Sequence, residues 1–99
     1  MATRIRQSSR NVFLDLGFPE EEAENLRLRA DLMIQITKLI RQRGLTQARA
    51  ARLMGVTQPR ISDISRGKIH RFSIDALVEM LGHAGVRVSL VLRARRRVA

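Results

Sequence analysis

Residues 45–68 read LTQARAARLMGVTQPRISDISRGK, and the organisation of the whole chain can be worked out from this stretch. It holds two short helix-forming runs, each preceded by a threonine and followed by a glycine. A threonine hydroxyl accepts a hydrogen bond from a free N–H at a helix start, and glycine tolerates the left-handed conformation that ends a helix. We therefore predict helices over 46–54 and 57–65, ended by Gly55 and Gly67 and joined by one tight turn.

The small and apolar residues of the stretch have the spacing of a helix-turn-helix. Where two helices meet at a steep angle, the first needs a small residue at the contact, and the turn needs a residue that tolerates a sharp bend. Ala51 and Gly55 meet these needs, and Val56, Ile61 and Ile64 follow as core-facing positions. From these residues alone, a plain helical hairpin in an unrelated bundle is the alternative.

The chain before this stretch predicts an extended arm and one long helix. The apolar run 11–16 favours extended backbone, within a flexible arm over 1–18. Pro19 suits the first turn of a helix, the glutamates after it suit the positive end of the helix dipole, and Gly44 ends the helix. The helix also carries a second apolar row, Leu28, Leu32 and Leu39. That row either widens the core face or meets a partner subunit.

The chain after the stretch predicts one more helix and a strand. Ser73 is a helix cap, and the helix continues with an apolar stripe to its end at Gly85. Residues 86–92 then alternate in the period of a half-buried strand, with apolar Val86, Val88, Leu90 and Leu92 on one side. A strand needs a partner, which is either 11–16 or the same strand of a second subunit. We expect a DNA-binding domain over 19–85, with its motif at 46–65, and a dimerisation element over 86–99.

Charge indicates a nucleic acid partner. The 99 residues carry a net charge of +10, and residues 38–71 hold nine basic side chains against the single acidic Asp63. Such a field attracts polyanions. Sequence-specific RNA binding usually stacks bases on aromatic rings, whereas this chain has three phenylalanines and no Tyr or Trp. Double-stranded DNA is therefore the favoured partner. The run 93–97 holds four further arginines and is either a solvated tail or a functional one.

Composition argues against several other classes. No apolar run approaches the roughly 20 residues of a membrane-spanning helix, and no apolar stretch follows the basic N-terminus as in a secretory signal. There is no cysteine, and only His70 and His83 could serve acid–base or metal chemistry. We expect a soluble, cytoplasmic protein that is not an enzyme and needs no metal or cofactor.

The motif resembles the Cro/cI-type helix-turn-helix family, also called the XRE family. The resemblance is clearest in Gly44-Leu45-Thr46-Gln47, Met54-Gly55-Val56-Thr57-Gln58 and Ile61-Ser62-Asp63-Ile64-Ser65-Arg66-Gly67-Lys68. It implies a mainly all-α, lambda-repressor-like bundle of about five helices, with a short C-terminal β-strand. Residues 11–20 and 23–26 also look like the HigA-like antitoxins of this family. That likeness implies a repressor of its own operon that neutralises a small toxin; a free-standing regulator and a protein-binding module are the alternatives.

In such a motif the second helix lies in the major groove and the first crosses the DNA backbone. The residues expected on DNA are Gln47, Thr57, Gln58, Pro59, Arg60, Ser62, Asp63, Arg66, Lys68 and Arg71. Gln58 can bond adenine through two contacts, and Arg60 can bond guanine or a phosphate. Pro59 can pack on a thymine methyl, although many relatives carry a polar side chain there. Asp63 either accepts from cytosine or orients Arg60 or Arg66.

Phosphate contacts are expected from Gln47, Arg66, Lys68 and Arg71, because such contacts set register without reading sequence. One reading helix covers few base pairs, so a homodimer on a palindromic operator is expected, with half-sites about 34 Å apart. The predicted dimer interface is formed by Val86, Val88, Leu90 and Leu92.

Overall fold

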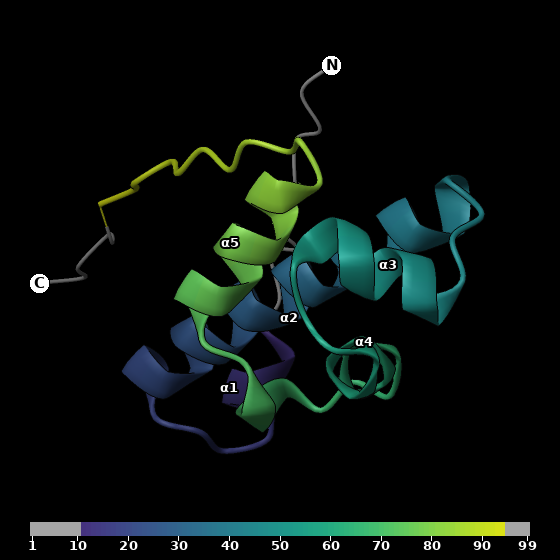
Figure 1. Ribbon diagram of the computed structural model, residues 1–99. Helices are drawn as coiled ribbons and strands as arrows, with labels where there is room; N and C mark the ends of the chain where they lie inside the picture. Colours follow the sequence, from purple (N-terminus) through teal and green to yellow (C-terminus); the bar gives the residue numbers. More distant parts are fainter. Residues whose placement is uncertain (1–10, 95–99) are drawn as a thin grey trace, which may run out of the picture.

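The computed structural model describes residues 11–94 as a bundle of helices (Figure 1). The elements are α1 (Val12–Asp15), α2 (Glu20–Gln42), α3 (Gln47–Met54), α4 (Gln58–Ser65), the 3-10 turn η1 (Ile69–Arg71) and α5 (Ile74–His83). The predicted mainly α-helical class is confirmed. Most of the predicted arm and the run of arginines near the C-terminus lie outside the described residues.

The long helix α2 forms one wall of the bundle. It begins directly after Pro19 and ends one residue before the cap Arg43, close to the predicted bounds. Gly44 follows with a φ of +59°, the left-handed geometry that glycine adopts at low cost. In the second apolar row Leu32 and Leu39 are buried and Leu28 is half-buried. This row therefore belongs to a wide core face.

The two motif helices form at the predicted positions. The Thr46 hydroxyl accepts from the Arg49 amide at 3.1 Å, which caps α3. Gly55 ends α3 with a φ of +69°, and the Val56 amide donates to the Ala51 carbonyl at 3.0 Å across the turn. Ala51 is buried, as a steep helix crossing requires. The turn therefore aims α4 across α3.

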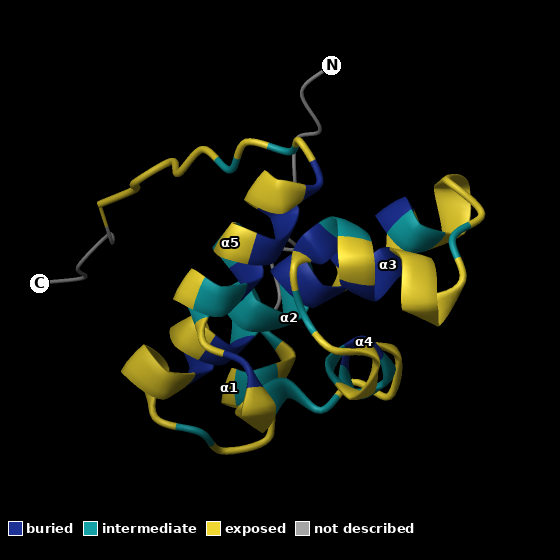
Figure 2. Ribbon diagram, in the orientation of Figure 1, coloured by how far each residue is buried: buried dark blue, intermediate teal, exposed yellow. Residues whose placement is uncertain are grey.

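A single apolar core joins α2, α3, α4 and α5 (Figure 2). The largest fully buried side chains of the described residues are Phe72, Leu26, Ile36, Met54, Ile61, Leu77, Met80 and Leu81. The Ser73 hydroxyl accepts from the Ala76 amide at 3.1 Å and caps α5, as predicted. Phe72 lies just before this cap, so the segment between α4 and α5 is anchored in the core.

On α2, Arg27 bridges two carboxylates of the same helix, Glu24 and Asp31. The hydrogen bond to Glu24 is the main cause that raises the pKa of Arg27 above its usual value. Burial raises the pKa of Asp31, and the neighbouring Arg27 charge offsets part of that rise. Each carboxylate lies about one helix turn from Arg27, which is the spacing at which side chains on one helix face meet.

The prediction of an extended run over 11–16 is wrong, because a short helix forms there. The Asn11 side-chain oxygen accepts from the Phe13 amide at 3.0 Å and caps α1, while its side-chain nitrogen donates to the Ala23 carbonyl at 3.2 Å. Gly17 ends α1 with a φ of +94°, and the Phe13 and Phe18 rings meet edge to face. Asparagine and glycine at these positions are themselves helix start and stop signals.

The predicted C-terminal strand is also absent from the described residues. Val86 and Val88 are half-buried against the core, and the Val86 amide donates to the Leu81 carbonyl at 2.9 Å. Beyond them Leu90 and Leu92 are 74% and 91% exposed. Since α1 is helical, residues 11–94 contain no strand for this segment to pair with.

Residues 11–94 contain neither a candidate membrane-spanning helix nor a candidate metal site. None of the helices within 11–94 combines the length and apolar character that crossing a membrane requires. The same residues contain no group of three or more His, Asp or Glu side chains placed to hold a metal ion.

Candidate nucleic-acid interface

The beginning of α4 presents an exposed polar tip, which we define as Thr57, Gln58 and Pro59. On the side of α4 that faces the core, Ile61 and Ile64 are buried, at 1% and 3% exposure. These two residues fix α4 against the core, so the tip projects from a rigid support. A helix held in this way can enter a DNA groove without rearrangement.

Thr57 stands at the N-cap position of α4, but its side chain makes no capping hydrogen bond. Its carbonyl receives the Arg60 amide at 3.1 Å, so the helix start rests on backbone contacts. Proline near the start of α4 fits this arrangement because it lacks the N–H that would need a partner. The predicted helix start is confirmed, while the predicted hydroxyl cap is wrong.

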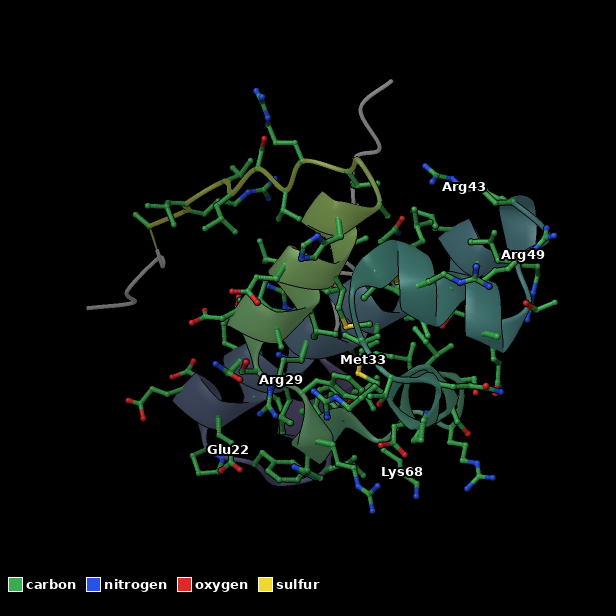
Figure 3. The ribbon with its side chains drawn as sticks, viewed as in Figure 1. Glu22, Arg29, Met33, Arg43, Arg49 and Lys68 are labelled. Carbon is green, nitrogen blue, oxygen red and sulfur yellow. The ribbon has the colours of Figure 1, made fainter. Side chains whose placement is uncertain are left out.

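Basic residues lie along the segment that follows α4. Arg66 and Arg71 are exposed, and Lys68 is half-exposed. Lys68 lies beside α4, while Arg43 and Arg49 lie around the α2–α3 corner, so basic side chains occur near both ends of the motif (Figure 3). Gln47 is exposed on the first turn of α3, where a helix start suits a phosphate contact.

Asp63 points back to the segment after its own helix. Both of its oxygens accept from Arg71, each at 3.2 Å, and Lys68 approaches at 3.9 Å. The Asp63 side chain is only 13% exposed, whereas that of Arg71 is 58% exposed. The predicted orienting role therefore has different partners, since Asp63 holds Arg71 and Lys68 rather than Arg60 or Arg66.

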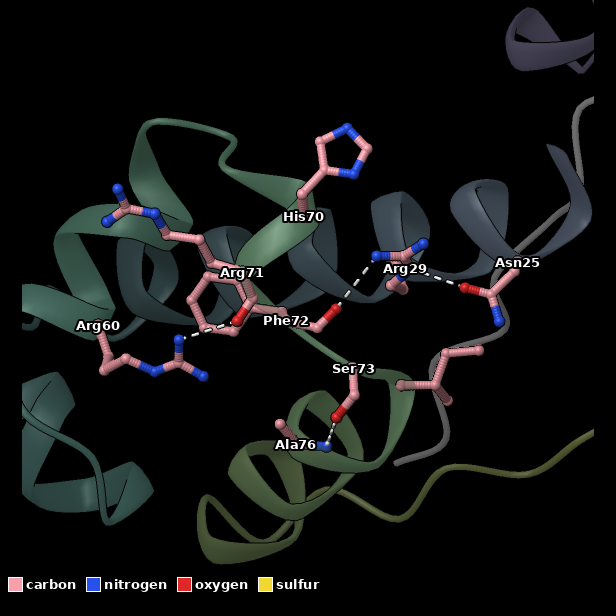
Figure 4. A pocket seen from close by; sticks show the side chains of 9 residues that line it. Asn25, Arg29, Arg60, His70, Arg71, Phe72, Ser73 and Ala76 are labelled. Atoms are coloured by element: carbon pink, nitrogen blue, oxygen red, sulfur yellow. Dashed lines mark hydrogen bonds between the residues drawn. The ribbon is translucent and has the colours of Figure 1, made fainter. Parts of the chain in front are cut away.

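Arg60 is turned toward α5 and away from the tip. Its guanidinium carbon lies 4.1 Å from the centre of the Phe72 ring, and one of its nitrogens donates to the Arg71 carbonyl at 2.9 Å. On the α2 side Arg29 donates to the Phe72 carbonyl at 3.4 Å (Figure 4). These side chains border an open pocket of about 480 Å³ between α2, α4 and α5.

The structure thus brings Asp63, Lys68 and Arg71 together and sets Arg60 apart from the exposed tip. Sequence reasoning missed Arg29 and Phe72, which hold the segment between α4 and α5. A buried aromatic within a basic segment was the one available signal for Phe72. No such signal existed for Arg29, since the carbonyls that it holds in this segment belong to residues about forty positions further along the chain.

Comparisons with known proteins agree with this architecture. A family model described as a helix-turn-helix domain matches residues 12–93. A solved structure of a protein provisionally assigned to the XRE family of transcriptional regulators is similar at a TM-score of 0.71 and 28% identity, covering 79% of this chain and 91% of that one. No curated protein sequence matches the chain.

Proposed function

The chain belongs to the helix-turn-helix domain family, in its Cro/cI-type (XRE) branch, and on this premise we propose that it is a sequence-specific DNA-binding regulator that represses its own operon. The observation that carries the proposal is the exposed tip of α4, which rests on two buried isoleucines. Reading bases requires side chains that are free to bond and a helix that does not move beneath them.

Within the tip, Gln58 is the proposed base reader. Its exposed amide can donate to and accept from one adenine edge in the major groove, a pairing that distinguishes adenine from the other bases. Thr57 offers a hydroxyl without a capping partner, Pro59 offers an apolar ring to a thymine methyl, and Ser62 lies one turn further on.

Phosphate contacts come from the ends of the motif in this proposal. Gln47 holds one side from the start of α3, and Arg66, Lys68 and Arg71 hold the other. Log K should fall with log salt by roughly 0.9 per phosphate neutralised, with about five to eight phosphates per dimer. Arg60 and Asp63, which the sequence also places on DNA, instead form hydrogen bonds with Arg71 within the protein.

A homodimer on a palindromic operator is the proposed assembly, and the element 86–99 is its proposed interface. Support comes from Leu90, Val91 and Leu92, which are all more than 70% exposed, whereas Val86 and Val88 pack on the core of their own domain. Two such segments can pair with each other across a twofold axis. Truncation after Gly85 should give a monomer in sedimentation velocity, and a truncated dimer contradicts this interface.

A second candidate role, neutralising a toxin encoded beside it, is favoured by one observation. The short helix α1 exposes Val12 and Leu14, at 59% and 44%, and its C-cap Leu16 is 68% exposed. Exposed apolar groups of this kind suit a protein partner. Co-purification with the product of the neighbouring gene, lost on Leu16→Asp but kept on Gln58→Ala, tests this role separately from DNA binding.

Footprinting on the protein's own promoter tests the main proposal. Wild-type protein should protect an inverted repeat, and Gln58→Ala should lose that protection while keeping its fold. Gln42→Ala is the matched control, because Gln42 is an exposed glutamine at the end of α2. Uniform coating of the promoter by the wild-type protein would contradict sequence-specific reading.

A further inference from the structure

The side of α4 that carries Arg60 differs from the side that carries Gln58. Residues four apart share a helix face, so Arg60 lies with Ile64, which is buried at 3% exposure. Gln58 is two residues before Arg60 and therefore lies on a nearly opposite face. Arg60 is half-buried whereas Gln58 is exposed, so Arg60 starts from a poorer position to reach a base in a groove.

One face and one N–H group of the Arg60 guanidinium make contacts within the protein. Its flat face covers the Phe72 ring at 4.1 Å, and its edge donates to the Arg71 carbonyl at 2.9 Å. Turning the guanidinium outward to the edge of a guanine would break both contacts. An arginine over an aromatic ring and a charged hydrogen bond each contribute to holding the residues they join.

Residues 68–72, the segment that Arg60 touches, are also held by one residue of α2 and by a second residue of α4. From α2, Arg29 donates to the Ile69 carbonyl at 3.2 Å and to that of Phe72 at 3.4 Å. From α4, Asp63 accepts from Arg71 at 3.2 Å. The segment therefore has a defined position although it contains only one 3-10 turn.

We propose that Arg60 is a positioning residue for DNA binding: it holds the 68–72 segment in place so that Lys68 and Arg71 meet phosphates, and it contacts no base. The inference rests on the proposed DNA-binding function. Its physical basis is pre-organisation, because a segment that is already ordered loses less conformational entropy when it binds.

Arg60→Met is the test variant, since methionine can keep an unbranched apolar stem on Phe72 but loses the charge and the hydrogen bond. In the free protein, hydrogen exchange at the Arg71 and Phe72 amides should accelerate roughly threefold to tenfold. These amides donate to the Lys68 and Ile69 carbonyls and so report on the segment. Unchanged exchange at both amides would overturn the proposal.

Binding to an operator duplex and to a scrambled duplex gives the second readout. Arg60→Met should weaken both by a similar factor of roughly threefold to tenfold and leave the preference at every operator base unchanged. A changed preference at one base pair would instead identify Arg60 as a reader and overturn the proposal. Circular dichroism and thermal unfolding establish that the variant is folded.

A double-mutant cycle separates positioning from a direct phosphate contact. If Arg60 acts through the segment, Arg60→Met should have little effect on DNA affinity once Lys68→Met and Arg71→Met are present. Arg66→Met is the matched control: it should weaken binding additively with that pair and leave segment exchange unchanged. Full additivity for Arg60→Met would overturn the proposal. If the wild-type protein binds no duplex, the proposed function fails, whereas the exchange result still decides whether Arg60 holds the segment.

Discussion

The tip of α4 and the 68–72 segment lie at opposite ends of one short helix and are built in opposite ways. The side chains at the tip are exposed, and Thr57 at its start makes no capping bond. The segment carries exposed cations as well, but Arg29, Arg60 and Asp63 tie its backbone and side chains to the domain. Bases differ from site to site, so a reader must be free to bond, whereas phosphates recur at every site and suit a rigid contact.

The largest expected effect is a loss of stability when Phe72, which anchors the 68–72 segment in the core, is shortened. Phe72→Ala removes a fully buried ring and should lower the free energy of unfolding by about 3–5 kcal/mol in urea denaturation. Phe13→Ala is the matched control and should cost much less, because Phe13 is only half-buried. A loss below about 1 kcal/mol for Phe72→Ala would show that the segment is not held through the core.

The next effect concerns the tip. Gln58→Ala should leave the free energy of unfolding within about 0.5 kcal/mol, because the side chain is exposed. Affinity for the operator should fall by about 1–3 kcal/mol, with little change for a scrambled duplex, in fluorescence anisotropy titrations. Equal losses on both duplexes would mean that the tip contacts phosphates, like the segment.

The turns that lead into the two regions should be equally intolerant of a side chain, because the backbone conformation is the same at both glycines. Gly55 precedes the tip and Gly67 precedes the segment, and both have a φ of +69°. Alanine in this conformation costs about 1–2 kcal/mol. At Gly55 the added carbon would also lie 3.4 Å from the His83 ring, whereas nothing lies within 4 Å at Gly67. The distance at Gly55 is an ordinary van der Waals contact and adds no clash, so the two substitutions should lower the melting temperature by similar amounts. A much larger loss for Gly55→Ala would show that the turn between α3 and α4 is packed more tightly than this distance indicates.

The smallest effect is expected at Asp63. Asp63→Asn should lower the free energy of unfolding by about 0.2–1 kcal/mol, since it weakens contacts to partly exposed Arg71 and Lys68. Asparagine can still accept a hydrogen bond from Arg71, so the segment keeps that contact, and affinity for any duplex should rise modestly because a negative charge is removed near phosphates. Asp75→Asn, on exposed Asp75 of α5, is the control. A changed preference at one cytosine would show that Asp63 reads a base.

Much of the architecture was accessible from local signals. Thr46, Gly55, Gly67 and Ser73 correctly marked helix ends, because capping and left-handed turns depend only on residues within one helix turn. Asn11 and Gly17 carried the same kind of signal for α1, but the apolar run between them suggested extended backbone. Caps are the more specific evidence in a segment too short for periodicity to decide.

The remaining features depend on distant neighbours. The alternation over 86–92 describes which side chains could be buried, but a strand forms only where another strand supplies its hydrogen bonds, and α1 is helical. Likewise, the sequence lists Arg60 as a cation on the reading helix and cannot say where it points. The direction of the Arg60 side chain depends on the Phe72 ring, twelve residues away, and on the Arg71 carbonyl. Both belong to a segment that Arg29 of α2 also holds. Short-range rules thus establish the motif and its charge, and long-range packing establishes which of its arginines are held by contacts within the protein.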